Sequence, residues 1–246
     1  MEREQFYKMM QGEGTLDYER YLNTSKLLTC QKDYKDFCNA DELQFQIAHQ
    51  TEELWMKLIA YTLLDIDDYL QDENTFRVLS LFERVHRIER LMIENMTLLE
   101  TMSPKDYQEI RLQLGNGSGQ ESPGFRSLRQ MVTPLWNSFK YTYLEKKGLT
   151  VENIYNSKYQ HDETYMVAEA MFEYDLLFQN FLYHHIKLIH RSIGLQAKSL
   201  KGRSIDLLNS GLKIQLFPEL WTIRSEMTDQ WNEQYGVKRE PLSVDK

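Results

Sequence analysis

Histidines on predicted helices are the residues of this sequence best suited to metal or proton chemistry. His185 belongs to an apolar series that repeats at steps of three and four residues: Met171, Tyr174, Phe178, Phe181 and Leu188. This spacing puts His185 on the inner face of one long helix, whereas its neighbour His184 shares a face with polar side chains and should be solvated. A histidine in such a series is either a hydrogen-bonded core residue or a ligand, and an aromatic wall would suit a flat macrocycle.

Two other histidines carry weaker patterns. His49 lies one turn after Phe45 on another predicted helix and precedes two glutamates, so it could equally be a boundary histidine with acidic neighbours. Glu83 and His86 form a Glu-x-x-His pair, but a ferritin-like di-iron site needs two such pairs and two more glutamates. The sequence contains no second pair, which excludes a di-iron site.

The segment 115–124, here called the glycine loop, has four glycines and one proline in ten residues and cannot continue a helix. It lacks the Gly-Lys-Ser/Thr ending of a phosphate-binding loop, and no strand precedes it. It either joins two helices or covers a site, since loops that are costly to order are often functional.

Long helices must position these residues, and the low content of 5 Pro and 11 Gly favours them. We expect helices over about 18–28, 40–70, 75–100, 104–114 and 164–193, one more carrying Trp136 and Phe139, a polar connection over 146–162 and two short closing helices. Ser103 should cap the fourth of these helices, and Gly194 should end the long one. No alternating strand pattern appears, which predicts an all-α helical bundle forming a single domain over residues 1–246.

Apolar side chains at helical spacing mark two of these helices. The helix over 40–70 carries one series at helical spacing: Leu43, Ile47, Leu54, Leu58 and Tyr61. The inner face of the helix over 75–100 is expected at Phe76, Leu79, Phe82, Leu91 and Met92.

Composition excludes several classes of protein. The net charge of -8 and the lack of a Lys/Arg block argue against a nucleic-acid binder. No apolar stretch approaches the roughly 18 residues of a membrane span, and the N-terminus lacks the apolar core of a signal peptide. Cys30 and Cys38 show no metal-type spacing and are expected to be free thiols. These features predict a cytoplasmic protein that binds neither nucleic acid nor membrane.

Five segments in the same order resemble the tryptophan 2,3-dioxygenase family. They cover residues 18–22, 41–57, 99–115, 175–194 and 217–224. Each match would be weak alone, but together they are specific and span most of the chain. The resemblance implies an all-helical oxygenase with haem b and O2, acting on a small aromatic amino acid or indole, and assembled as a homo-oligomer (tetramer or dimer).

The resemblance also implies roles for individual residues. His185 would be the axial ligand of the haem iron, and His49 would be the catalytic residue that faces the substrate on the oxygen-binding side. Arg111 would bind the substrate carboxylate with two parallel charge-assisted hydrogen bonds. Tyr107 would add a hydroxyl donor, and Phe45 would form part of the apolar wall around the aromatic ring.

The resemblance implies further substrate contacts in the glycine loop, in a second loop at 198–202 and near the N-terminus. They would come from Ser118 and Gly119, from Ser199 and, through a neighbouring subunit, from Tyr18, Tyr21 and Leu22. Both loops depart from the family. Where the family has Ser-Gly-Phe-Gln-Ser, this sequence has Ser-Gly-Gln-Glu-Ser at 118–122. Where the family has Gly-Thr-Gly-Gly-Ser, this sequence has Lys-Ser-Leu-Lys-Gly at 198–202. The connection from Arg126 to the axial helix is also shorter than is usual in the family.

Three functions therefore stay open from the sequence. The first is a dioxygenase that inserts O2 across the indole C2–C3 bond of tryptophan or a related compound. The second is a haem-dependent monooxygenase that hydroxylates an aromatic amino acid or a modified indole. The third is a non-catalytic haem-binding helical protein. Tyr107 and Arg111 argue against the third, because a haem sensor does not need a carboxylate-binding pair.

Overall fold

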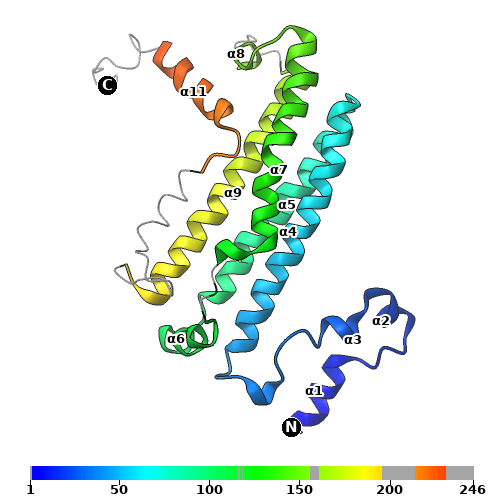
Figure 1. Cartoon of the computed structure of the whole chain (residues 1–246), viewed down its shortest axis with the longest axis vertical. Coiled ribbons are helices and arrows are strands. Elements are labelled where there is room, and N and C mark those ends of the chain that lie inside the picture. Colours follow the sequence, from blue (N-terminus) through cyan, green and yellow to red (C-terminus); the bar gives the residue numbers. More distant parts are fainter. Residues whose placement is uncertain (1, 116, 118, 156–160, 196–213, 231–246) are drawn as a thin grey trace, which may run out of the picture.

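Four long helices form the body of the molecule in the computed structural model, which describes residues 2–115, 117, 119–155, 161–195 and 214–230 (Figure 1). They are α4 (Glu42–Gln71), α5 (Thr75–Leu99), α7 (Pro123–Phe139) and α9 (Glu163–Ile193). α5 packs against both α4 and α9, and α7 packs along α4. No β-strand occurs among the described residues, and the expected all-α fold is confirmed.

The main hydrophobic core lies between these helices, and the sequence predicts its α9 side correctly. The apolar series of α9 is buried at Met171, Tyr174, Phe178, Phe181 and Leu188. The predicted inner face of α5 was less accurate, and the apolar series noted on α4 is not the buried one. The series of Leu43, Ile47, Leu54, Leu58 and Tyr61 lies exposed on α4, and Phe76 and Leu91 are exposed on α5, whereas Phe82 and Met92 are buried as predicted.

The physical reason is that α4 is apolar on two faces. Its core face consists of Met56, Ile59, Leu63, Ile66 and Leu70, which have the same helical spacing as the exposed series. Periodicity shows that an apolar stripe exists, but packing against α5 and α7 selects which of two stripes is buried.

Shorter helices lie at the two ends of the long ones (Figure 1). They are α6 (Pro104–Gln113), α8 (Val151–Tyr155) and α11 (Pro218–Gln230). The segment expected as a polar connection thus contains a helix, α8. Of the two expected closing helices, α11 is described, and most of the remaining tail lies outside the described residues. Between the helices are short turns of other types: η1 (Tyr34–Asp36), η2 (Gly119–Glu121), η4 (Glu145–Lys147) and the π-helical η3 (Lys140–Leu144).

The N-terminal region differs from the single helix expected over 18–28. It contains α1 (Arg3–Gln11), α2 (Asp17–Leu22) and α3 (Thr24–Leu27), which lie beside one end of the long helices (Figure 1). Asn23 separates α2 from α3 because its φ of 55° lies in the left-handed region, which asparagine tolerates better than most residues. The helix α1 was not predicted at all.

Two predicted helix ends are confirmed. The Ser103 side chain accepts the backbone N–H of Asp106 at 3.1 Å, and Pro104 is the first residue of α6. Gly194, with a φ of 82°, follows the last residue of α9. No described helix is long and apolar enough to cross a membrane.

Candidate active site

A small second core brings together helices that are distant in sequence. Its buried members come from α4, the end of α5, the turn before α6, α6 and α9: Ala48, Leu99, Met102, Ile110 and Leu188. Phe45 of α4 and Tyr107 of α6 pack against it, with their ring centroids 6.3 Å apart. Two of the predicted substrate-binding residues therefore meet at one end of the bundle.

His185 lies near this end, on α9, with its imidazole nearly parallel to the ring of Phe181 at a centroid distance of 6.4 Å. No hydrogen bond of either ring nitrogen occurs within the described residues, and the His185 side chain is half-buried. Burial, with a smaller contribution from nearby His49, lowers the pKa of His185 to about 4. The ring is therefore neutral at neutral pH, which is the form that binds a metal ion.

Gly119 of the glycine loop lies against the same imidazole. A Cβ atom built on Gly119 would be 3.6 Å from Cε1 and 3.9 Å from Nε2 of His185, so a larger residue would place its side chain at the ring. A neutral imidazole that lies beside an aromatic ring and is faced by a glycine fits the requirements of an axial haem ligand. The residues present are thus compatible with haem.

His49 is held by its own helix. Its Nδ1 lies 2.7 Å from the carbonyl oxygen of Phe45, and the two rings are tilted against each other at 4.1 Å. Part of the ring reaches solvent, but enough protein surrounds it for desolvation to lower the pKa of His49, against a smaller opposing effect of the Glu53 carboxylate. A neutral His49 is therefore favoured near pH 7.

Tyr107 and Arg111 are one turn apart on α6, and both are half-buried. Burial raises the pKa of Tyr107, and the positive charge of Arg111 partly opposes this effect. The guanidinium therefore lies close enough to act on the phenol. A cation beside a protonated hydroxyl can bind a carboxylate by charge and by hydrogen bonds.

The remaining predicted residues are not part of this assembly within one chain. Tyr18 and Tyr21 of α2 are 72% and 89% exposed, and Leu22 is also exposed. Ser118 and Ser199 lie outside the described residues.

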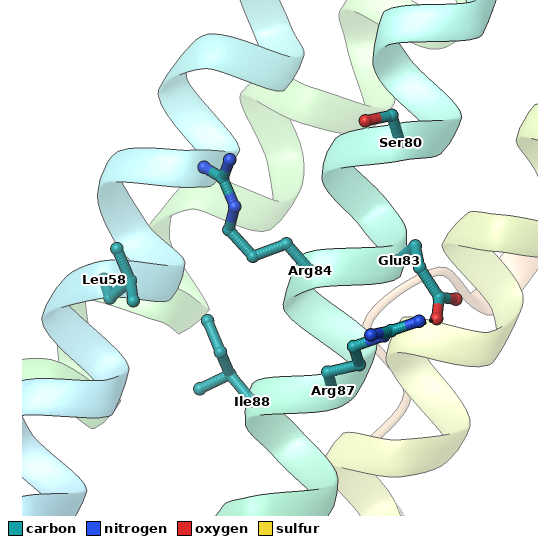
Figure 2. Close-up of a pocket in the computed structure, with 6 residues that line it drawn as sticks. All are labelled: Leu58, Ser80, Glu83, Arg84, Arg87 and Ile88. Carbon is teal, nitrogen blue, oxygen red and sulfur yellow. Dashed lines mark hydrogen bonds and ion pairs between the residues drawn. The ribbon is translucent and has the colours of Figure 1, made fainter.

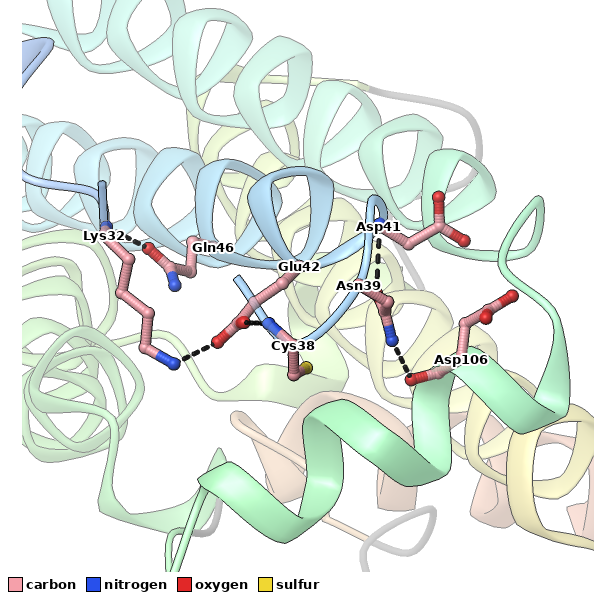
Figure 3. Close-up of polar contacts among 7 residues, drawn as sticks. All are labelled: Lys32, Cys38, Asn39, Asp41, Glu42, Gln46 and Asp106. Atoms are coloured by element: carbon pink, nitrogen blue, oxygen red, sulfur yellow. Dashed lines mark hydrogen bonds and ion pairs between the residues drawn. The ribbon is translucent and has the colours of Figure 1, made fainter. Parts of the chain in front are cut away.

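A polar network that the sequence did not reveal ties the start of α4 to α6 (Figure 3). The buried Glu42 carboxylate receives Lys32 Nζ at 2.5 Å and the backbone N–H of Cys38 at 2.7 Å. Burial would raise the pKa of Glu42, but these contacts hold it below its usual value. Asn39 donates to the carbonyl oxygen of Asp106 at 2.9 Å. The network fixes the helix of Phe45 relative to the helix of Tyr107.

The other histidine candidate has a structural role. His86 Nε2 lies 2.9 Å from the carbonyl oxygen of Ala170, and Glu83 pairs with Arg87 at 2.7 Å. Within the described ranges, no group of three or more His, Cys, Asp or Glu residues could hold a metal ion.

A groove of about 340 Å³ lies between α4 and α5 (Figure 2). It is lined by Leu58, Ser80, Glu83, Arg84, Arg87 and Ile88. It shares no residue with the cluster around His185, His49 and Tyr107 and contains no histidine. The chemistry-bearing residues therefore lie elsewhere.

Comparison with known proteins gives the family. Residues 2–141 match the tryptophan 2,3-dioxygenase family, and this range includes Phe45, His49, Tyr107 and Arg111. The chain belongs to this family. His185 lies beyond the matched range.

Individual tryptophan 2,3-dioxygenases are similar over nearly their whole length. That of Serratia proteamaculans is 26% identical, with 86% of this chain and 93% of that protein covered. That of Myxococcus xanthus is 27% identical, with 87% and 91% covered. That of Erythrobacter litoralis is 25% identical, with 85% and 97% covered. At these identities, individual residue roles must be argued from this chain's own geometry.

Proposed function

We propose that the protein is a haem-dependent dioxygenase that acts on tryptophan or a closely related indole amino acid and inserts both atoms of O2 across the indole C2–C3 bond. One observation carries this proposal: a neutral His185 lies at the same end of the bundle as His49 and the Tyr107–Arg111 pair. A haem-binding protein without a substrate would not need the second group of residues.

His185 would hold the haem iron through a ring nitrogen, and the apolar side chains of α9 around it would exclude water. When bound, the haem supplies the oxygen chemistry, while the protein supplies binding and orientation. Gly119 would keep side-chain atoms away from the imidazole.

His49 and Phe45 would orient the substrate ring. Because the Phe45 carbonyl can only accept a hydrogen bond, Nδ1 of His49 carries the proton. In the neutral ring Nε2 is then an acceptor, which suits an indole N–H. The Phe45 ring offers an apolar surface beside it.

Arg111 and Tyr107 would bind the carboxylate of the amino acid. The planar guanidinium can form two parallel hydrogen bonds with a carboxylate, which fixes its orientation as well as its position. Tyr107 stays protonated at neutral pH because burial raises its pKa, so its hydroxyl remains a donor.

The N-terminal helices favour an assembly of several copies. Tyr18, Tyr21 and Leu22 expose large apolar side chains on α2, which is costly unless a partner covers them. We propose a homo-oligomer, a tetramer or dimer, in which these residues complete the site of a neighbouring copy. We further propose that the chain folds as a single domain and acts in the cytoplasm, where the free thiols of Cys30 and Cys38 would stay reduced.

Isotope labelling tests the proposed reaction. Reduced, haem-loaded protein is incubated with tryptophan under labelled O2, and the products are analysed by mass spectrometry. Incorporation of two labelled atoms per product molecule is expected. A single labelled atom would indicate hydroxylation instead, and an unlabelled, unchanged substrate would contradict an oxygenase.

A further inference from the structure

The end of the glycine loop is fastened to α4 by one carboxylate. The backbone N–H of Gly124, the second residue of α7, donates to Glu53 Oε2 at 3.0 Å. Ser122 caps the same helix through its side chain, which accepts the Phe125 N–H at 3.0 Å. Because Pro123 has no N–H, Glu53 satisfies the first free amide of α7, where a negative charge is also favoured by the helix dipole.

The backbone approaches α4 at Gly124 more closely than any other residue would allow. A Cβ atom there would lie 2.7 Å from Met56 Cβ and 2.8 Å from Glu53 Oε2. Distances this short force a shift, and the Met56 Cβ atom next to the α4 backbone cannot move away easily. The glycine and the carboxylate therefore form one matched contact, here called the Glu53–Gly124 contact.

One hydrogen bond and one packing contact connect the Glu53–Gly124 contact with His185. Gly119 begins the turn η2, and the N–H of Ser122 donates to the Gly119 carbonyl at 3.2 Å. Gly119 in turn lies against the His185 imidazole. Because only four residues lie between Gly119 and Gly124, an anchor at Gly124 limits where Gly119 can lie.

Glu53 also follows His49 by one turn on α4, so both side chains lie on the same face of that helix. Its charge reaches the imidazole, because it partly offsets the desolvation that lowers the pKa of His49. The same turn of α4 thus carries the substrate-facing histidine and the anchor of the loop.

We propose that Glu53 is a positioning residue: its carboxylate holds residues 119–124 against α4, one turn after His49. The contact itself is independent of the reaction, whereas its effect on turnover rests on the proposed function. Glu53 acts through Gly124.

Two substitutions separate positioning from charge. Glu53→Ala removes the acceptor, whereas Glu53→Gln keeps an amide oxygen that can accept the Gly124 N–H. Glu94→Ala on α5 is the matched control, because Glu94 is exposed and its side chain makes no hydrogen bond or ion pair within the described residues. Gly124→Ala disrupts the same contact by adding a Cβ atom at residue 124. It replaces Glu53→Ala in the experiment if that variant folds poorly.

Hydrogen–deuterium exchange of peptides covering residues 119–126 is measured on the full chain without substrate. Glu53→Ala and Gly124→Ala should exchange about tenfold faster there, as expected for loss of a charge-assisted hydrogen bond, while Glu53→Gln and Glu94→Ala stay near the wild type. Unchanged exchange in Glu53→Ala would overturn the contact.

Turnover per bound haem gives the second measurement. Because misplacement by about 1 Å can cost roughly 100-fold, Glu53→Ala should lose between about ten- and a hundredfold in kcat/KM with normal haem content, and Glu53→Gln should recover most of it. Equal kcat/KM for Glu53→Ala and wild type would overturn the positioning role. A wild-type protein that inserts no oxygen would contradict the proposed function instead, and exchange would still report on the contact.

Discussion

The Nδ1–H of His49 donates to the carbonyl oxygen of Phe45, one turn earlier on α4, over a distance of 2.7 Å. This bond fixes the tautomer of the imidazole, because a carbonyl cannot donate. It also fixes the ring orientation, since Phe45 itself packs against the small core that contains Ala48 and Ile110. His49 can orient a substrate only if its own ring is held in place, and the hydrogen bond to the α4 backbone holds it.

Haem binding should depend on His185 and not on its neighbour. His185→Ala removes the only ring nitrogen proposed to bind the iron, so most haem affinity should be lost. His184→Ala is the matched control, because His184 lies half-buried on a different face of α9, next to Tyr183. Haem titration followed by absorption spectroscopy measures both. Equal behaviour of the two variants would show that His185 is not the ligand.

Arg111 should control substrate affinity without affecting haem. Loss of a mostly desolvated bidentate contact should weaken binding by about 2–5 kcal/mol in Arg111→Ala. Arg111→Lys should not restore it, because an ammonium lacks the planar fork. Lys105→Ala, an exposed cation on the same helix, is the control. Equilibrium binding of tryptophan to haem-loaded protein decides the matter, and wild-type affinity in Arg111→Ala would refute the carboxylate contact.

Glu52 should make stability depend on pH. Its carboxylate is buried, with Oε1 accepting Asn95 Nδ2 at 2.7 Å and Oε2 unpartnered among the described residues. Burial raises its pKa to about 7, with a smaller effect from Glu53 in the same direction. The folded state therefore holds this proton more tightly than the unfolded state, so the contribution of Glu52 is most favourable below pH 4.5 and is lost as pH rises to about 7.

Glu52→Gln tests this dependence, because the amide keeps the Asn95 contact without the charge. A shift from 4.5 to about 7 corresponds to about 3 kcal/mol, so the variant should gain up to that much in free energy of unfolding at pH 8. At pH 4 the two proteins should be nearly equal. Urea unfolding of the haem-loaded proteins at both pH values measures it, with Glu94→Gln as an exposed control. The same difference at both pH values would rule out titration of Glu52 as the cause.

Predictions of buried residues and helix ends from the sequence are most accurate where the residue pattern is compatible with only one local structure. On α9 the predicted apolar series is buried in the structure, because its spacing keeps these side chains on one face. Ser103 and Gly194 likewise determine local ends through their own backbone preferences. On α4, by contrast, two apolar stripes compete, and only the neighbouring helices decide between Leu58 and Ile59.

Contacts between distant segments are the part that the sequence could not supply. Asn39 and Glu53 have no unusual spacing, yet both make hydrogen bonds with segments more than 60 residues away. Asn39 donates to Asp106 and Glu109, and Glu53 accepts from Gly124. Asn23 breaks the first predicted helix through a left-handed conformation that asparagine adopts only in some contexts. Residue type shows what chemistry is possible, whereas these partners are determined by packing.

His49 should matter through the nitrogen of the substrate ring. With Nδ1–H bound to Phe45, Nε2 can accept the indole N–H, and loss of that bond leaves the ring poorly oriented. His49→Ala should therefore keep its haem and fold normally but lose up to roughly 100-fold in turnover of tryptophan, as misplacement by about 1 Å would. A 1-methyl tryptophan cannot donate this bond, so it should lose much less than tryptophan when His49 is removed. Turnover of both substrates by both proteins separates the effects. Equal losses would show that His49 does not contact the ring nitrogen, and unchanged turnover with a modest loss of stability would leave it a boundary histidine beside Glu53.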